Sequence, residues 1–466
     1  MTKRNQVPDL TGVRRLGGSF RDPAGFLFFE NDIPLRQVNP VYADNFKLLT
    51  GSGLYQELSD AGQLISHEIV PEHKGLDGKA WCVLRPKWLS FVSYPYEWSF
   101  FQLQQAAVLT LDINLKAMAK GMILKDASAW NIQFDGCRPV LVDTLSLERY
   151  DKSKPWVAYR QFCQHFLNPL LLAAYCDATV LQEFIFRREG FSAAYAASRL
   201  PWRTRLNLGI LMHVHLNKRL SVNTSGSDPA ATFSFEKLER VLLHLRGMVA
   251  SLKPRASKTT WEDYYSGSIS GEGYLNEKAA VVEELIQLTN GITATDLGCN
   301  NGYFSRMLQQ AGYRVIAIDS DVQAIDQLAR ANHQSPVNSL LTIVADISNP
   351  SPALGWRNSE DKQLIDRLEA DTCLSLALWH HLYFQYNIPL ADIAAFTASI
   401  CRQFLIVEYV PVDDKKTQII SRGKEQLIPG YSREAFEKAV SVFFRIIEIR
   451  MLSEEKRIIY LLKRNT

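Results

Sequence analysis

The sequence predicts two domains, a C-terminal α/β domain with a mostly parallel sheet and an N-terminal α+β domain. In the C-terminal half, strand-like and helix-like patterns alternate, which is typical of parallel strands joined by crossover helices. At its end, residues 443–450 and 457–463 predict two strands whose short connection makes them antiparallel. A polar stretch separates this half from the N-terminal region. We therefore expect domains at 1–220 and 261–466, joined by a linker and connecting helix at 221–260.

Charge and composition exclude several classes of protein. The 466 residues carry 52 Lys plus Arg against 49 Asp plus Glu, a net charge of +3. This balance disfavours a nucleic-acid partner, because non-specific binding to nucleic acid or anionic lipid needs a densely basic surface. The apolar runs are far shorter than the roughly 20 residues that cross a bilayer, and no apolar signal segment follows the first residues. We expect no membrane span.

The cysteines indicate a reduced environment. They are odd in number and stand singly, without a Cys-x-x-Cys pair, which argues against a disulfide framework or a zinc site. We therefore expect a cytoplasmic protein in which each cysteine packs as a small apolar side chain. The seven are Cys82, Cys137, Cys163, Cys176, Cys299, Cys373 and Cys401.

The most informative stretch is a strand, a glycine-bearing turn and a helix. A strand predicted at 293–297 leads into the turn from Gly298 to Gly302. Gly298 allows a tight turn and Gly302 allows a ligand or helix to approach closely. The next strand, 314–319, ends in Asp319, about 20 residues after the turn, where a carboxylate can bind two ribose hydroxyls. Open α/β sheets bind their ligands at this edge.

The following strands also end in polar side chains. They are 341–345, which ends at Asp346; 372–378, which precedes His380 and His381; and 404–407, which precedes Glu408. The carboxyl ends of parallel strands share one edge of the sheet, so we expect these groups to line one rim.

These elements resemble those of the class I S-adenosylmethionine-dependent methyltransferases over residues 261–466. The segment DLGCNNG at 296–302 resembles their first motif, although Asn300 stands where the family usually has a glycine. Asparagine tolerates left-handed dihedral angles better than most residues. The resemblance implies a seven-stranded Rossmann-like sheet with a terminal antiparallel hairpin. It also implies S-adenosylmethionine as cofactor, bound by Asp296, Gly298, Asn300, Gly302, Asp319 and Asp346.

Four further expectations concern the reaction and its cofactor. An acid after the second strand fits NAD as well, but the shortened glycine pattern and the hairpin favour the methyl donor. Methyl transfer depends largely on placing the nucleophile, so a dedicated base is dispensable; if one acts, His380 or His381 has a suitable pKa. Glu408 either orients substrate or is structural. Tyr265 lies in an aromatic segment that either covers the donor or packs against the linker.

A second set of polar residues lies in the N-terminal region. Asp126, Asn131 and, after a hairpin, Asp143 have the spacing that phosphoryl transfer uses, with one carboxylate as base and the other two groups on magnesium. They resemble the loops of kinase-like phosphotransferases, which implies ATP and Mg²⁺ if the domain is active. The segment Leu124-Lys125 departs from the residues that usually precede the first Asp.

The kinase-like hypothesis assigns three more parts. The glycines at 17–18 belong to a hairpin over a nucleotide, and Arg36 stands where a phosphate-binding lysine is usual. Glu57 is a candidate partner for Arg36, although an exposed helix carboxylate is the more common interpretation of a single Glu, and we expect residues 93–98 to link two lobes. The alternatives are a domain that binds without chemistry, or loop residues that serve only as turn formers and caps.

Over its full length the chain resembles the NoeA-type nodulation proteins. We therefore expect a methyltransferase that acts on a small-molecule, glycan or lipid-linked acceptor. The alternatives are a bifunctional kinase and methyltransferase, or a binding and scaffolding protein that has lost both reactions. Acceptor pockets lie in loops without a general code, so the acceptor itself does not follow from the sequence.

Overall fold

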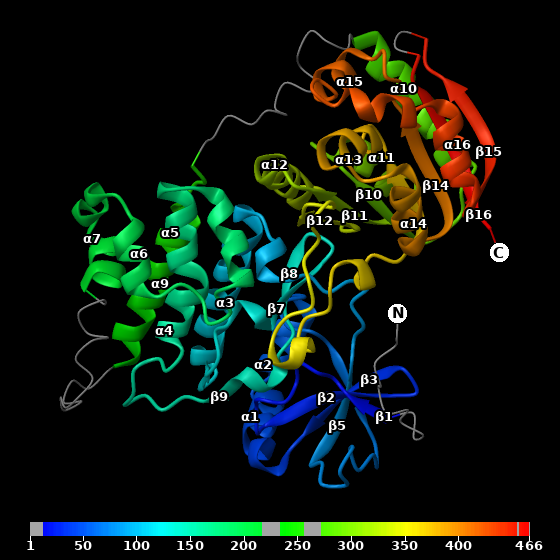
Figure 1. Ribbon diagram of the computed structural model, residues 1–466. Coiled ribbons are helices and arrows are strands. Elements are labelled where there is room, and N and C mark those ends of the chain that lie inside the picture. The colour runs from blue at the N-terminus through cyan, green and yellow to red at the C-terminus, as the bar shows by residue number, and fades with distance from the viewer. Residues whose placement is uncertain (1–12, 217–233, 256–271, 454–455, 466) are drawn as a thin grey trace.

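The computed structural model describes residues 13–216, 234–255, 272–453 and 456–465 (Figure 1). Two sheets of different construction form the two ends of the molecule, and a helical region lies beside them. Tyr265, which we expect either over the donor or against the linker, lies outside the described residues.

The N-terminal domain begins with a five-stranded antiparallel sheet. In pairing order its strands are β1 (Val13–Arg15), β2 (Gly25–Glu30), β3 (Ile33–Val38), β5 (Cys82–Pro86) and β4 (His67–Val70). Two helices, α1 (Ala43–Gly51) and α2 (Leu54–Asp60), separate β3 from β4 in the chain. Fully buried leucines on both helices, Leu49 and Leu54 among them, join them to the core of the domain.

A long helix, α3 (Phe100–Ala119), organises the rest of the N-terminal domain. It starts with a capping box in which Ser99 and Gln102 satisfy each other's backbone amides. Two short antiparallel ladders follow: β6 (Met122–Leu124) with β9 (Leu147–Arg149), and β7 (Ile132–Asp135) with β8 (Arg138–Leu141). Helices α4 (Tyr159–Phe162), α5 (Asn168–Tyr175), α6 (Ala193–Arg199) and α7 (Leu208–Ile210) complete the region.

The predicted connecting helix is present as α9 (Phe235–Ser251) and packs along α3. Gln104 Nε2 on α3 donates to the carbonyl of Val249 (2.8 Å), and Arg246 pairs with Asp112 (2.5 Å). This helix is therefore held by the N-terminal domain.

The C-terminal domain contains the predicted parallel sheet with an antiparallel end. Its order is β12 (Leu340–Val344), β11 (Arg314–Asp319), β10 (Thr293–Leu297), β13 (Ala370–Ser375), β14 (Cys401–Tyr409), β16 (Ile458–Arg464) and β15 (Phe444–Met451). The first five strands are parallel, and β16 runs antiparallel to both of its neighbours. The sheet expected from the sequence is confirmed.

The two faces of this sheet are covered by different parts of the chain. Helices α10 (Glu272–Gln287), α11 (Tyr303–Gln310) and α12 (Val322–His333) cover one face, and α14 (Leu390–Ile400) and α16 (Arg433–Ser441) lie on the other. Each face has its own hydrophobic core, the first under α10, α11 and α12 and the second under α14 and α16. Because successive side chains of a strand point to opposite faces, Leu340 belongs to the first core and Leu341 to the second. The second core continues without a break into the N-terminal domain.

The connection between β12 and β13 explains this continuity. Residues 345–369 contain two short 3₁₀ turns and no α-helix, although parallel strands usually need a helical crossover. At the β12 edge of the sheet, Gln102 Nε2 of α3 donates to the Thr342 carbonyl (3.0 Å). Nearby, Asp326 on α12 accepts the amide of Phe101 (2.6 Å). The N-terminal domain therefore packs where a crossover helix would otherwise lie.

Two predictions about the whole chain can be compared with the structure. All seven cysteines are free. In the part of the chain that the structure describes, no helix combines the length and apolarity needed to cross a bilayer.

Candidate functional site

The turn after β10 has the backbone shape that its sequence predicts. Gly298, Asn300 and Gly302 all adopt positive φ angles, of 75°, 50° and 72°. The amides of Gly298 and Cys299 donate to the Ile318 carbonyl at 2.9 and 3.0 Å, which ties the turn to the end of β11. Asn300 adopts the left-handed conformation that a glycine would otherwise supply, so its departure from the usual motif leaves the turn intact.

The two glycines meet different surroundings. A Cβ on Gly302 would lie 2.4 Å from both methyl carbons of Leu328 on α12, so this glycine allows α11 and α12 to pack closely. A Cβ on Gly298 would lie 3.4 Å from Leu378, the residue before α13 (Trp379–Tyr386). Gly298 therefore lies next to the segment that follows β13.

Asp319 and Asp346 end neighbouring strands on the same rim. The Asp319 carboxylate accepts the amides of Asn300 (2.8 Å) and Asp321 (2.9 Å), one on each oxygen. A carboxylate has about four acceptor sites, so Asp319 retains capacity for two ribose hydroxyls. Asp346 is half-buried and uses one oxygen to accept the amide of Ser348 (2.8 Å). The acceptor capacity of these two carboxylates has the chemistry that the ribose and adenine of S-adenosylmethionine require.

Asp296 lies deeper than the other acids. It is 3% exposed and accepts the hydroxyl of Ser305 on α11 at 2.5 Å. Burial raises the pKa of this carboxyl to about 7. Asp296 therefore ties strand β10 to helix α11.

Glu408 belongs to a buried charge network rather than to the open rim. Its oxygens accept from Lys278 Nζ (2.6 Å) and the Tyr274 hydroxyl (2.9 Å), both on α10, while Arg457 lies 3.4 Å away. Arg457 also pairs with Asp414 at 2.8 Å. Burial raises the pKa of Glu408, but the neighbouring cations outweigh it and hold that pKa below its usual value. The network fixes α10 against β14 and β16.

His380 and His381 lie at the start of α13, with ring centroids 4.2 Å apart. His380 is 1% exposed, and neither of its ring nitrogens has a hydrogen-bond partner among the described residues. Burial, followed by the nearby His381, lowers the pKa of His380 well below its ordinary value. Burial lowers the pKa of His381 to about 4. Both rings are therefore neutral at physiological pH.

The structure gathers the predicted N-terminal residues in one place. Burial, with the charge of Asp143 next, raises the pKa of Asp126. Asp143, which the kinase-like hypothesis puts on magnesium, forms an ion pair with Arg36. Asn131 ends the short turn between Asp126 and β7. No group of three or more metal-ligating side chains occurs among the residues that the structure describes.

One predicted pair is wrong. Glu57 lies 3.5 Å from Lys116 Nζ on α3, whereas Arg36 pairs with Asp143. The reason is that Glu57 on α2 faces the long helix, while β3 carries Arg36 toward the loop after β8.

Several functional contacts were missed at the sequence level. Tyr274 and Lys278 are four residues apart, a spacing that puts both on one face of a helix, and this signal was available. Arg457 and Asp414 are brought together only by the sheet order. Their pairing had no local sequence signal.

Comparison with solved structures gives partial matches. The N-methyltransferase NodS from Bradyrhizobium japonicum WM9, with S-adenosyl-L-homocysteine, is 12% identical and matches 44% of this chain and 93% of its own, with a TM-score of 0.33. Magnesium protoporphyrin IX methyltransferase from Synechocystis PCC 6803 is 18% identical, over 46% and 90%, with a TM-score of 0.31. The bifunctional kinase-methyltransferase WbdD is 16% identical, over 46% and 45%, with a TM-score of 0.31.

The C-terminal sheet, with its five parallel strands, final antiparallel hairpin and glycine turn, defines a domain with the Rossmann-like fold of methyltransferases. Sequence comparison agrees with this region: the family model for tellurite resistance protein TehB matches residues 261–353. The nodulation protein NoeA of Rhizobium meliloti (strain 1021) is 31% identical over 97% of this chain and 96% of its own. The chain belongs to the NoeA family.

Proposed function

We propose that the C-terminal domain transfers a methyl group from S-adenosylmethionine to a small-molecule, glycan or lipid-linked acceptor. The observation that carries the proposal is that the turn at 298–302, Asp319 and Asp346 follow three adjacent strands of this sheet. When bound, S-adenosylmethionine supplies an electrophilic methyl group on a sulfonium sulfur. The near-neutral charge of the chain favours a small acceptor over a long polyanion.

Each strand end has a separate task in this proposal. The turn at 298–302 receives the methionine part, Asp319 accepts hydrogen bonds from the ribose hydroxyls, and Asp346 receives the adenine side. The two amides that Asp319 accepts fix its orientation before the donor arrives. Such preorganisation reduces the entropy lost when the donor binds.

His380 is the candidate base if one assists the transfer, although it is 1% exposed and its lowered pKa makes it a weak proton acceptor. It is neutral, and its two ring nitrogens lack partners among the described residues. A neutral imidazole can accept a proton from an acceptor hydroxyl or amine as the methyl group is transferred. Because in-line displacement depends largely on placing the acceptor against the methyl group, the reaction does not require a dedicated base.

We also propose that the N-terminal domain is kinase-like in architecture. The sheet order β1-β2-β3-β5-β4, the helices between β3 and β4, and the approach of Asp126 to Asp143 favour it. Phosphoryl transfer has less support, because Arg36 neutralises Asp143. ATP turnover that disappears in both Asp126→Ala and Asp143→Ala would establish the bifunctional alternative.

The proposed reaction is tested with the full-length chain, methyl-labelled S-adenosylmethionine and an extract of the source cells. We expect label to enter a small-molecule or glycan fraction, and Asp319→Ala to reduce this by at least about tenfold, because the ribose loses a charge-assisted partner. Asp392→Ala, an exposed carboxylate on α14, is the matched control and should retain activity. Equal labelling by both variants would contradict the role of Asp319.

A further inference from the structure

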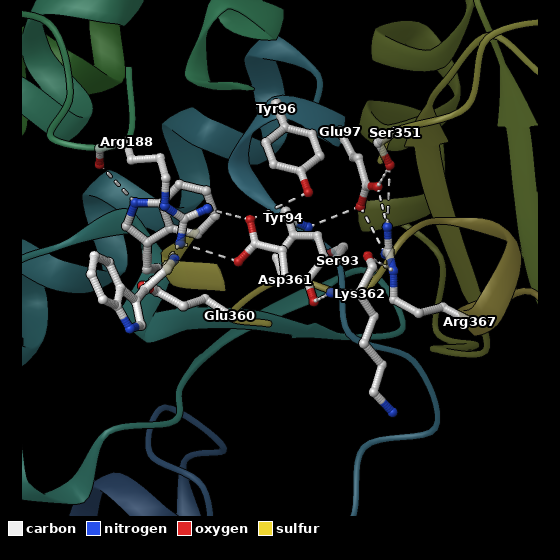
Figure 2. A network of polar contacts seen from close by, with 12 residues as sticks. Ser93, Tyr94, Tyr96, Glu97, Arg188, Ser351, Glu360, Asp361, Lys362 and Arg367 are labelled. Atoms are coloured by element: carbon white, nitrogen blue, oxygen red, sulfur yellow. Dashed lines mark hydrogen bonds and ion pairs between the residues drawn. The ribbon is translucent and has the colours of Figure 1, made fainter. Parts of the chain in front are cut away.

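Between β12 and β13 the chain leaves the C-terminal domain and enters the N-terminal domain. Residues 351–367, here called the inserted segment, contact the link at 93–98 and the helical region around Arg188 (Figure 2). They also contact the loop between β1 and β2 through Arg21. The segment therefore lies in the cleft between the two parts of the N-terminal domain. In a kinase-like domain this cleft is where a nucleotide would bind.

The base of the inserted segment is held by one carboxylate. Glu97 accepts from Arg367 Nη1 at 3.0 Å, pairs with Arg367 Nη2 through its other oxygen, and accepts the Ser351 hydroxyl at 2.8 Å. The side chains of Glu97 and Arg367 are 1% and 5% exposed. Arg367 also donates to the Val92 carbonyl (2.7 Å). Glu97 thus joins the two ends of the segment to the link between the lobes.

The tip of the segment is held by arginines from both sides of the cleft. Arg188, from the helical region, forms a two-point ion pair with Asp361 and lies 3.3 Å from Glu360. Its guanidinium also lies 4.3 Å from the ring centroid of Trp130. Arg21, from the side of the sheet, pairs with Glu360 at 2.7 Å. Opposite charges therefore match across the cleft, and two carboxylates of the tip are largely buried.

The glycines of the first hairpin fit the segment closely. A Cβ on Gly17 would lie 2.1 Å from the carbonyl oxygen of Ser359, and one on Gly18 would lie 3.1 Å from that of Glu360. A side chain at residue 17 would collide with backbone, so the hairpin accepts the segment only because a glycine is there. The pair that the sequence places over a nucleotide lies over the chain's own backbone instead.

We propose that the inserted segment is the resident ligand of the N-terminal cleft and competes with a magnesium-bound nucleoside triphosphate for it. Glycines 17 and 18, Arg36 and Asp143 are the groups that would face the phosphates and metal once the segment leaves. While the segment is in place, its tip packs against Gly17 and Gly18 and is paired with Arg21 and Arg188. The apparent affinity for nucleotide is then reduced by the fraction of molecules in which the cleft is open.

The proposal is tested on the full-length chain with Arg188→Met, which keeps the aliphatic stem and removes the charge. Because a hydrogen bond between charged groups changes an equilibrium by about tenfold or more, we expect hydrogen exchange of 351–367 to rise about tenfold. In calorimetric titration, Mg-ATP should bind this variant about tenfold more tightly than wild type. Asp361→Asn weakens the same pair from the other side and should give the same result.

The control is the neighbouring Arg187→Met, which removes a pair with Glu183 inside the helical region and should change neither measurement. Arg188→Lys keeps the charge and should restore most of the protection. Two outcomes overturn the proposal: exchange of the segment unchanged in Arg188→Met, or a Mg-ATP affinity that is equal, or undetectable, in wild type and variant. The proposal rests on the kinase-like architecture proposed above, but neither readout depends on methyl transfer, so its failure is distinguishable from a failure of the proposed methyltransferase reaction.

Discussion

Burial gives the acids of the C-terminal site different roles. Asp319 stays at the rim with acceptor capacity to spare, whereas Asp296 is enclosed and bonded to Ser305. Desolvation penalises the charged form of a carboxyl, which is why the pKa of Asp296 rises to about 7. Glu408, equally buried, stays ionised because two cations compensate it.

The raised pKa of Asp296 makes a prediction about stability. Its folded pKa lies above the unfolded value, so its contribution is fully present below about pH 4 and is lost as pH rises to about 7. Over that window we expect the free energy of unfolding of wild type, relative to Asp296→Asn, to fall by up to about 1.4 kcal/mol per pH unit. Urea unfolding from pH 4 to 8 measures this difference.

The control for that series is the exposed Asp392→Asn, whose curve should run parallel to wild type. Parallel curves for Asp296→Asn as well would show that the carboxyl of Asp296 is not held protonated in the folded state.

The sequence predicts the location of a site residue well when that residue stands at the end of a strand. Asp319, Asp346 and the glycines of the turn stand where the strand pattern puts them. Glu57 and Arg36 were paired wrongly because the partner of a charged side chain depends on tertiary packing. The same holds for Glu408, whose three polar neighbours, Tyr274, Lys278 and Arg457, come from two separate parts of the chain.

At the level of elements, periodicity predicts where the strands begin and end more closely than it predicts the connections between them. The strand from Arg314 to Asp319 has the predicted bounds, and β16 lies within one residue of its predicted bounds. The fourth strand ends at Ser375, three residues early, where the chain turns toward Ala377 with a φ of 50°. The crossover without a helix could not be predicted, because its contacts lie in another domain.

The close packing at Gly302, in the turn before α11, predicts how much an added side chain lowers stability. Gly302→Ala adds backbone strain at a φ of 72° and a collision with Leu328, whereas Gly312→Ala adds strain at a φ of 95° in open space. We expect both to destabilise the protein by about 1 kcal/mol or more, and Gly302→Ala to cost about 1 kcal/mol beyond Gly312→Ala. Chemical denaturation of the two variants gives the comparison, and equal losses would show that Leu328 moves aside freely.

At the scale of the whole molecule, the two domains share one hydrophobic core and a set of buried ion pairs. The 345–369 connection lacks a helix, and α3 packs at the edge it leaves open. Composition and periodicity predict two domains because each has its own sheet. They do not reveal the interface, since Glu97 and Arg367 are 270 residues apart in the chain.

The central claim is that the C-terminal domain binds a methyl donor, and calorimetric titration of the full-length protein tests it most directly. S-adenosylmethionine and NAD are titrated separately under the same conditions. The turn at 298–302, the rim acids Asp319 and Asp346, and the methyltransferase fold predict saturable binding of S-adenosylmethionine and no binding of NAD. Saturable binding of NAD, with no heat from S-adenosylmethionine, would contradict the account.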